Sequence, residues 1–170
     1  MKVWFYLPLV HSSLLDNPRC YEFATKVRNV LKDKRGWSNH GYAFVELRSK
    51  DDARLVSNND IMLLKLVPPS IMYDAYPQFK DEQLSVANVA AHTVDFNSDR
   101  WFGDIGNKSG LPLFDYQTYL VNHEVGHILG KGHLNPSNSL PSVPTPVMIQ
   151  QTKGIGDFMP NPWPTDLDSK

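Results

Sequence analysis

The chain has little cysteine, no long hydrophobic run and no excess of charge of either sign. Cys20 is the only cysteine, so no intrachain disulfide can form and stability must come from packing and from any bound metal. The longest apolar runs, residues 3–10 and 61–67, are far shorter than the roughly 20 residues that cross a bilayer. With 17 Lys and Arg against 18 Asp and Glu, the formal net charge is -1, and no basic excess argues for nucleic acid. We therefore expect no membrane span, no nucleic-acid partner and a monomer.

The 170 residues, 41% of them hydrophobic and 21% charged, are typical of one globular domain over residues 1–170. The apolar segment Val3–Leu9 predicts a strand that is buried on both faces in the middle of a sheet. Apolar residues at helical spacing predict a helix that begins at Pro18 and ends at Gly36. Two more strands are predicted, Tyr42–Leu47 and Ile61–Val67.

The next part of the chain ends in a second long helix. Residues 68–90 have no clean period and predict a loop, whereas His92–Phe96 alternates as a strand does. A second helix is predicted from Asp115, as N-cap, to Leu129, with Gly130 as its left-handed stop. The order of elements predicts a mixed α/β (α+β) fold with a twisted mixed sheet and two main helices.

Residues 131–170 differ from the rest in composition. Seven of the 13 prolines fall between Pro136 and Pro164, and no helix or strand pattern continues there. Apolar residues such as Met148, Phe158 and Trp163 supply anchors that a disordered tail would lack. We expect a small irregular C-terminal subdomain, from residue 131 onward, packed against the N-terminal subdomain of residues 1–130.

The second predicted helix carries the motif H-E-x-x-H-x-x-G-x-x-H. His123 and His127 are four residues apart and therefore lie on one face of the helix, one turn from each other. Gly130 permits the backbone turn that brings His133 round as a third ligand. Five specified positions arise by chance in roughly one chain of this composition in 100,000. The motif predicts a site for one zinc ion.

Three imidazole ligands leave one position of a tetrahedral zinc open, as in catalytic sites. Glu124 follows a ligand directly and, about a hundred degrees round the helix, reaches a water without binding the metal. It is the predicted general base, which takes a proton from the attacking water and passes it to the leaving amine. A purely structural zinc site has no use for this carboxylate and usually has a fourth protein ligand.

The motif resembles that of the metzincin clan of zinc metallopeptidases. Their pattern adds a tight turn with a methionine beneath the metal, and Met148, fifteen residues after His133, fits this Met-turn. Its role would be packing, and the alternative is that Met148 is an ordinary core residue.

Five segments carry a closer resemblance that covers most of the chain: Arg35–Trp37, Asn97–Trp101, Val121–His127, Pro146–Gly154 and Pro160–Pro164. In order and spacing they resemble the landmarks of the DUF3152 family of zincin-like proteins. Its members are usually secreted or membrane-anchored, but this chain lacks their N-terminal targeting segment, so its location stays open. It also has no cysteines beside His133 or Asp157, where those relatives carry a pair.

The resemblance implies a zincin/metzincin-like fold with an active-site cleft between the subdomains. An exposed edge strand above the cleft would bind an extended peptide, and His92–Phe96, with His92 and Val94, is the candidate; an interior strand is the alternative. Gln151 and Lys153, after the Met-turn, would line the pocket for the substrate side chain beyond the scissile bond, or would be solvated loop residues.

These observations predict a zinc-dependent endopeptidase of metzincin type that acts on a peptide or protein substrate. Two alternatives stay open. One is a catalytically silent zinc-containing binding module, and the other is a zinc amidase for a non-protein amide, because zinc and Glu124 would serve any amide carbonyl.

Overall fold

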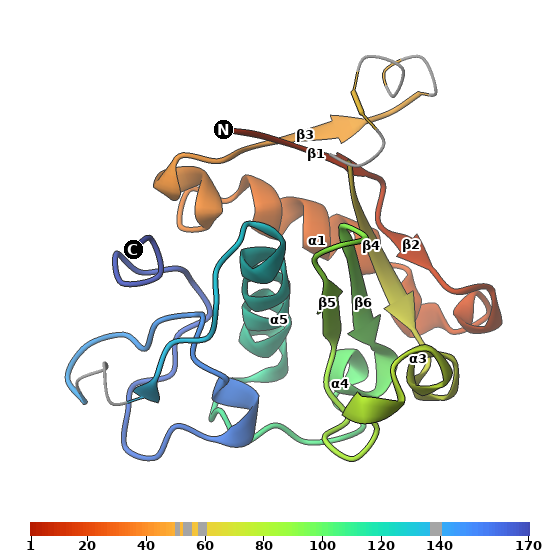
Figure 1. The fold of residues 1–170 in the computed structure, drawn as a ribbon. Helices are drawn as coiled ribbons and strands as arrows, with labels where there is room; N and C mark the ends of the chain where they lie inside the picture. The colour runs from red at the N-terminus through yellow and green to blue at the C-terminus, as the bar shows by residue number, and fades with distance from the viewer. Residues whose placement is uncertain (50–51, 53–55, 58–60, 137–140) are drawn as a thin grey trace.

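A six-stranded sheet forms the centre of the computed structural model, which describes residues 1–49, 52, 56–57, 61–136 and 141–170 (Figure 1). The strand order is β3-β1-β4-β6-β5, and β2 also pairs with β4. Every pairing is parallel except that of β5 with β6. With helices beside it, this sheet confirms the predicted mixed α/β class. The strands are β1 Lys2–Tyr6, β2 Leu9–Val10, β3 Ala43–Leu47, β4 Ile61–Val67, β5 Val86–Asn88 and β6 Thr93–Asn97.

The predicted N-terminal strand lies inside the sheet, between β3 and β4, but it is interrupted. β1 ends at Tyr6, and after Leu7 and Pro8 the chain pairs with β4 again as β2. Proline has no N–H to donate, so a continuous strand through Pro8 would lose a ladder hydrogen bond. The predicted burial on both faces is also wrong for Trp4 and Tyr6, which stay partly exposed.

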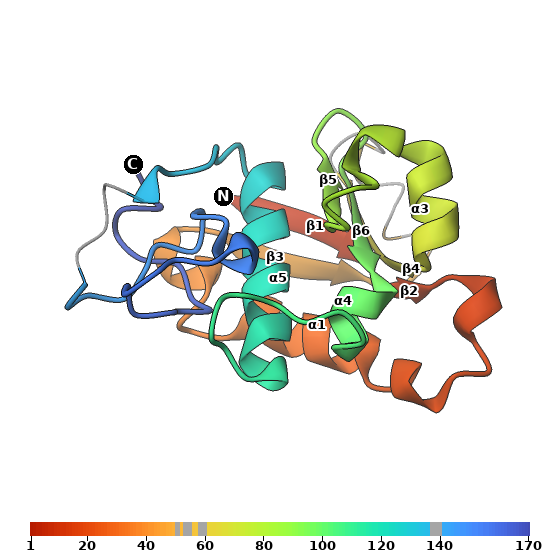
Figure 2. The same cartoon turned by 90° about the horizontal axis from the view of Figure 1, so that it is seen from below.

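Helices cover both faces of the sheet (Figures 1 and 2). The two longest, α1 and α5, share one apolar core with the inner face of β4 and β6, and α3 packs on the outer face against Val67 and Val86. The helices are α1 Phe23–Lys32, α3 Pro69–Ala75, α4 Ser98–Phe102 and α5 Leu113–Ile128. Short 3-10 turns lie at Ser12–Leu14, Pro18–Cys20, Trp37–His40, Pro77–Phe79 and Gln151–Lys153.

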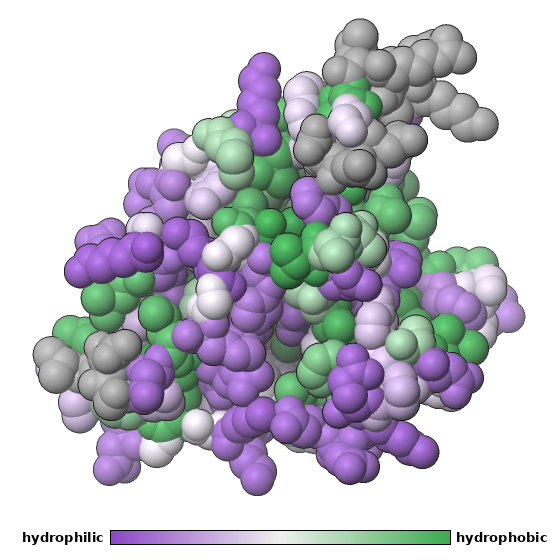
Figure 3. All heavy atoms as spheres, in the orientation of Figure 1, coloured by the Kyte–Doolittle hydropathy of each residue, from purple (hydrophilic) through white to green (hydrophobic). Residues whose placement is uncertain are grey.

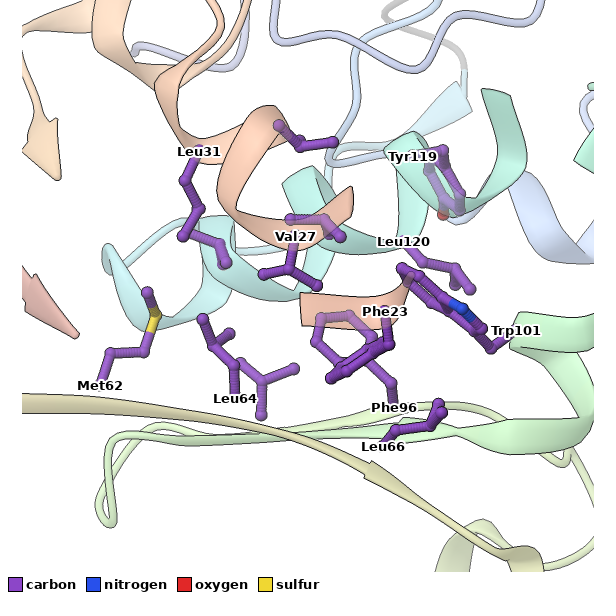
Figure 4. Close-up of a cluster of buried hydrophobic side chains, with 14 of the residues drawn as sticks. Phe23, Val27, Leu31, Met62, Leu64, Leu66, Phe96, Trp101, Tyr119 and Leu120 are labelled. Atoms are coloured by element: carbon purple, nitrogen blue, oxygen red, sulfur yellow. The ribbon is translucent and has the colours of Figure 1, made fainter. Parts of the chain in front are cut away.

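The main core lies between the sheet and the pair α1 and α5 (Figure 4). Alternate residues of β4 point into it, because successive side chains of a strand face opposite sides of the sheet. Phe23 of α1 is fully buried and meets Phe96 and Trp101 edge to face, with ring centroids 5.8 and 4.8 Å apart. The core fixes α5, and α5 carries the first two histidines of the motif. The β4 residues in the core are Met62, Leu64 and Leu66.

Several predicted boundaries are wrong, each for a local reason. The helix expected from Pro18 is split into a 3-10 turn and α1, and it ends at Lys32. The loop expected over residues 68–90 contains α3 and β5, both too short to give a clean period. Asn97 caps α4, because its side chain accepts hydrogen bonds from the Asp99 and Arg100 amides.

Residues 131–170 are irregular, as predicted. In the part of this segment that the structure describes, its regular elements are one 3-10 turn and one isolated bridge between Pro144 and Met159. Val147, Met148 and Ile149 are nonetheless buried, and Trp163 packs on the main core. Across all described residues, no helix combines the length and the apolar character needed to cross a membrane.

Candidate metal centre

Helix α5 presents two histidines and releases the chain toward a third. It begins after Pro112, so Asp115 lies in its first turn and is not its N-cap, which corrects the prediction. Beyond α5, Gly130 has φ 84°, a left-handed conformation that glycine adopts at little cost and that turns the chain back toward the helix. Only this turn allows His133 to reach the face that carries His123 and His127.

The three rings converge. The Nε2 atom of His133 lies 3.2 Å from Nε2 of His123 and 3.1 Å from Nε2 of His127, and the three residues form a group able to hold one metal ion. Nitrogens bound at about 2.0–2.1 Å to one tetrahedral zinc would lie about 3.3 Å apart. The arrangement therefore fits a tetrahedral metal ion with three protein ligands.

The outer nitrogens of two rings are fixed by backbone carbonyls. His123 Nδ1 lies 2.7 Å from the Val147 carbonyl, and His127 Nδ1 lies 2.8 Å from the Lys131 carbonyl. A carbonyl only accepts, so each Nδ1 must carry the proton and donate it, which leaves the Nε2 lone pair free for a metal. The sequence motif did not reveal either carbonyl, because both lie in irregular backbone.

The surroundings also favour the neutral form of the rings. Burial, and after it the neighbouring His127, lowers the pKa of His123 to about 3. Burial lowers the pKa of His127 and of His133 as well, and nearby positive charge from Lys153 adds to the effect on His133. Metals bind the neutral imidazole, so near neutral pH all three residues offer ligands without first losing a proton.

Glu124 is separate from the three ligands but adjacent to them. It is 6% exposed, and burial raises its pKa to about 8. The residue lines a small cavity that His123, Tyr116 and Tyr119 also line. A carboxyl in such a place has a stronger affinity for protons than one in water, which suits a group that accepts and then returns a proton.

Met148 and Trp37 pack under the helix at Gly126, inside the motif. A Cβ atom on Gly126 would overlap Met148 Sδ and lie 2.8 Å from Trp37 Cζ2. Trp37 is held in place by its indole N–H, which donates to the Asn122 carbonyl at 2.9 Å. Glycine before the second histidine of the motif therefore permits this close approach, and any larger residue there must displace Met148 and Trp37.

A buried carboxylate of the C-terminal segment supports the turn that contains Met148. Asp168 is 3% exposed and accepts hydrogen bonds from the amides of Val147 at 3.0 Å and Met148 at 2.8 Å. It also accepts from the amide and hydroxyl of Thr165. Asp168 therefore fixes the backbone of Val147, and the Val147 carbonyl in turn orients the ring of His123. Nothing in the sequence motif pointed to Asp168.

The four residues predicted to bind substrate lie in different surroundings. β6 pairs on both sides, so the interior alternative holds for residues 92–96 and the edge is β5. Val94 is 0% exposed in the main core and has no free surface, and His92 lies in the turn before β6. Gln151 is also buried, bonded to the Asn161 backbone at 2.7 and 3.0 Å, so it does not line an open pocket. Lys153 is exposed and pairs with Glu82 at 2.8 Å.

Fold and site together define a mixed α/β protein with a three-histidine candidate metal centre at the end of its longest helix. The family described as "Protein of unknown function (DUF3152)" matches residues 19–161. The match covers most of the chain, including all three histidines, and the chain belongs to this family. No curated protein and no solved structure matches it.

Proposed function

We propose that this protein is a zinc-dependent endopeptidase of metzincin type. The observation that carries the proposal is the convergence of three Nε2 atoms, 3.1 and 3.2 Å apart, beside a buried carboxylate that is outside the ligand group. Zinc bound there would polarise a peptide carbonyl and lower the pKa of a water molecule to about 7. The position of Met148 under α5 agrees with a Met-turn that supports the ligands by packing.

The chain's own residues have distinct tasks in this reaction. His123, His127 and His133 hold the metal, and the carbonyls of Val147 and Lys131 keep the first two rings in the metal-binding tautomer. Glu124 accepts a proton from the attacking water and delivers it to the nitrogen of the departing amine. Its buried position, which raises its pKa, makes both transfers feasible near neutral pH.

Strand β5 offers a place for the substrate backbone. It is the last strand on its side of the sheet within the described residues, and it packs next to α5 (Figure 1). Leu84 and Ser85, which precede it, line the small cavity with His123 and Glu124. An extended peptide that paired with the free edge of β5 would therefore pass the metal centre. This replaces residues 92–96, which we expected from the sequence.

The test compares the zinc-loaded protein with Glu124→Gln and His127→Ala on a library of unbiased peptides, with cleavage read by mass spectrometry. Glu124→Gln should keep one zinc per chain and cleave about 10²–10⁴-fold more slowly, because only the proton carrier is lost. His127→Ala should lose both zinc and cleavage, because a site with three ligands tolerates no missing one. Glu22→Gln, an exposed residue before α1, is the control and should match the parent.

Three results would contradict the proposal. If the zinc-loaded parent leaves every peptide intact, the chain is not a peptidase, and a binding module or an amidase for non-protein substrates becomes the better description. If Glu124→Gln cleaves as fast as the parent, Glu124 is not the proton carrier. Full zinc occupancy in His127→Ala would reject the ligand set.

A further inference from the structure

A larger cleft adjoins the small cavity at Glu124. Its volume is about 440 Å³, and three residues, Leu84, Arg100 and Thr152, line both spaces. A part of a bound substrate that extends from the metal centre past these shared residues would enter the larger cleft directly. The side chains around the larger cleft include those of Glu82, Lys108 and Lys153. We call this space the basic cleft.

Arg100 builds one wall of the basic cleft, and among the residues that the structure describes its guanidinium forms no ion pair with a carboxylate. Its guanidinium donates to the carbonyls of Glu82 at 3.1 Å, Gln83 at 2.9 Å and Gly106 at 2.6 Å. These bonds tie the segment before β5 to the loop after α4, so the wall is preorganised. Carbonyl acceptors satisfy the N–H groups but carry no net charge, and the cleft keeps the positive charge.

Two lysines that also line the basic cleft add to this charge. The Lys108 amide donates to the Thr152 carbonyl at 3.1 Å, which fixes its backbone at the cleft, and its ammonium has no ion pair among the described residues. Lys153 pairs with Glu82, but both side chains are about half exposed, at 45% and 49%, so the pair contributes little and opens easily.

The local balance is therefore three cations against one carboxylate, in a chain whose net charge is only -1. The lower part of the molecular surface in this view is covered mostly by hydrophilic side chains (Figure 3). Leu84 is the one apolar side chain of the basic cleft, so an apolar substrate group would find little to pack against. A carboxylate would find one fixed and two movable positive charges.

We propose that the basic cleft selects substrates with a carboxylate next to the scissile bond. The carboxylate belongs to an Asp or Glu side chain, or to the C-terminus of a short peptide. This inference rests on the proposed peptidase function for the reaction itself. The recognition step stands on the cleft alone and is tested without catalysis.

The first measurement profiles cleavage by the zinc-loaded protein in a library of peptides with amidated C-termini, and in the same library with free C-termini. One position beside the cut should favour Asp and Glu over Asn and Gln by about tenfold in kcat/KM, the size expected for one added charge contact. If the free C-termini alone show the preference, the carboxylate is terminal. A profile with neither preference overturns the inference and leaves the peptidase function intact.

The second measurement reads binding in the zinc-loaded Glu124→Ala protein, which cannot complete the reaction. The probes are fluorescein-labelled, terminally blocked alanine octapeptides that carry either one Glu or one Gln, together with the Gln peptide with a free C-terminus. Anisotropy should show about tenfold tighter binding of a carboxylate probe, weakened by added salt. If binding shows this preference while no peptide is ever cleaved by the parent, the proposed function fails and the cleft inference stands.

Charge-reversal variants test whether the preference for a carboxylate arises in the basic cleft. Lys108→Glu together with Lys153→Glu should abolish the preference for carboxylate in both measurements and favour a Lys-containing peptide instead. Lys34→Glu changes the charge of an exposed lysine after α1, outside the cleft, and should keep the preference. An unchanged preference in the double variant would overturn the inference, and normal zinc content and thermal unfolding would show that this variant is folded.

Discussion

Apolar side chains stabilise the sheet with α1 and α5, whereas hydrogen bonds from side chains to backbone stabilise residues 131–170. Phe23, Leu64 and Phe96 are each at most 1% exposed in the main core. In the C-terminal segment, Asp168 bonds three amides, and Asn161 donates to the carbonyls of Thr145 at 3.0 Å and Trp163 at 2.6 Å. A proline-rich chain whose described part has one isolated bridge leaves many backbone groups without a backbone partner, so side chains must satisfy them.

The candidate metal centre lies where these two regions meet. His123 and His127 come from α5, which the core fixes, and His133 comes from the irregular segment. Apolar burial is non-directional and large in total, while one hydrogen bond contributes about 0.5–1.5 kcal/mol net but fixes an orientation. We therefore expect core substitutions to change the stability of the whole protein, and substitutions in the C-terminal segment to change metal affinity first.

Phe23→Ala should have the largest effect on stability. It removes a fully buried ring that contacts Phe96 and Trp101, and should lower the free energy of unfolding by about 3–5 kcal/mol. Zinc affinity of the folded fraction should stay within about twofold of the parent, because no metal ligand is touched. Urea unfolding and zinc titration give the two values. Phe114→Ala, at a residue 69% exposed, is the matched control and should cost less than about 1 kcal/mol.

Asp168→Asn should lower both the stability and the zinc affinity, whereas Phe23→Ala should lower only the stability. The variant loses hydrogen bonds to a charged acceptor and should unfold about 2 kcal/mol more easily. Because the Val147 carbonyl then holds His123 less firmly, zinc affinity should fall about tenfold. Asp166→Asn alters an exposed carboxyl of the same segment and should change neither quantity. Competition with a chelator measures the affinity, and an unaltered affinity in Asp168→Asn would break the proposed link between the two regions.

Gly126→Ala tests the contact between α5 and Met148 of the C-terminal segment. It should have the smallest effect on the free energy of unfolding. The added methyl group must displace Met148 and Trp37, which costs about 1–3 kcal/mol, while alanine gains about 1 kcal/mol over glycine in a helix. We expect a net loss of about 1 kcal/mol in urea unfolding. Gly132→Ala, where an added Cβ meets nothing within 4 Å, should leave stability unchanged. A stabilised Gly126→Ala protein would show that Met148 does not pack tightly under α5.

Sequence reasoning succeeded where a pattern is local and repeated. β4 was predicted with the observed bounds, and the helix of the motif was predicted with its N-cap three residues too late and its last residue one too late. It failed for α3 and for the split of the N-terminal strand, because a two-turn helix has too few residues to show a period and a single proline decides the break. Val94, a candidate substrate residue, lies inside the sheet and not at its edge, because alternation does not reveal which strand lies at the edge. Gln151, another candidate, is buried by hydrogen bonds to the Asn161 backbone, which no local pattern indicates.

The sequence by itself determined the class of the fold and the three histidines of the candidate metal centre, since helical geometry places residues four apart on one face and a glycine turns the chain readily at position 130. The tertiary structure decided what surrounds those ligands: the carbonyls of Val147 and Lys131, the carboxylate of Asp168 and the edge strand β5. These groups come from segments far apart in the chain or from backbone in irregular regions. Their meeting depends on the packing of the whole core and on hydrogen bonds that no short pattern encodes.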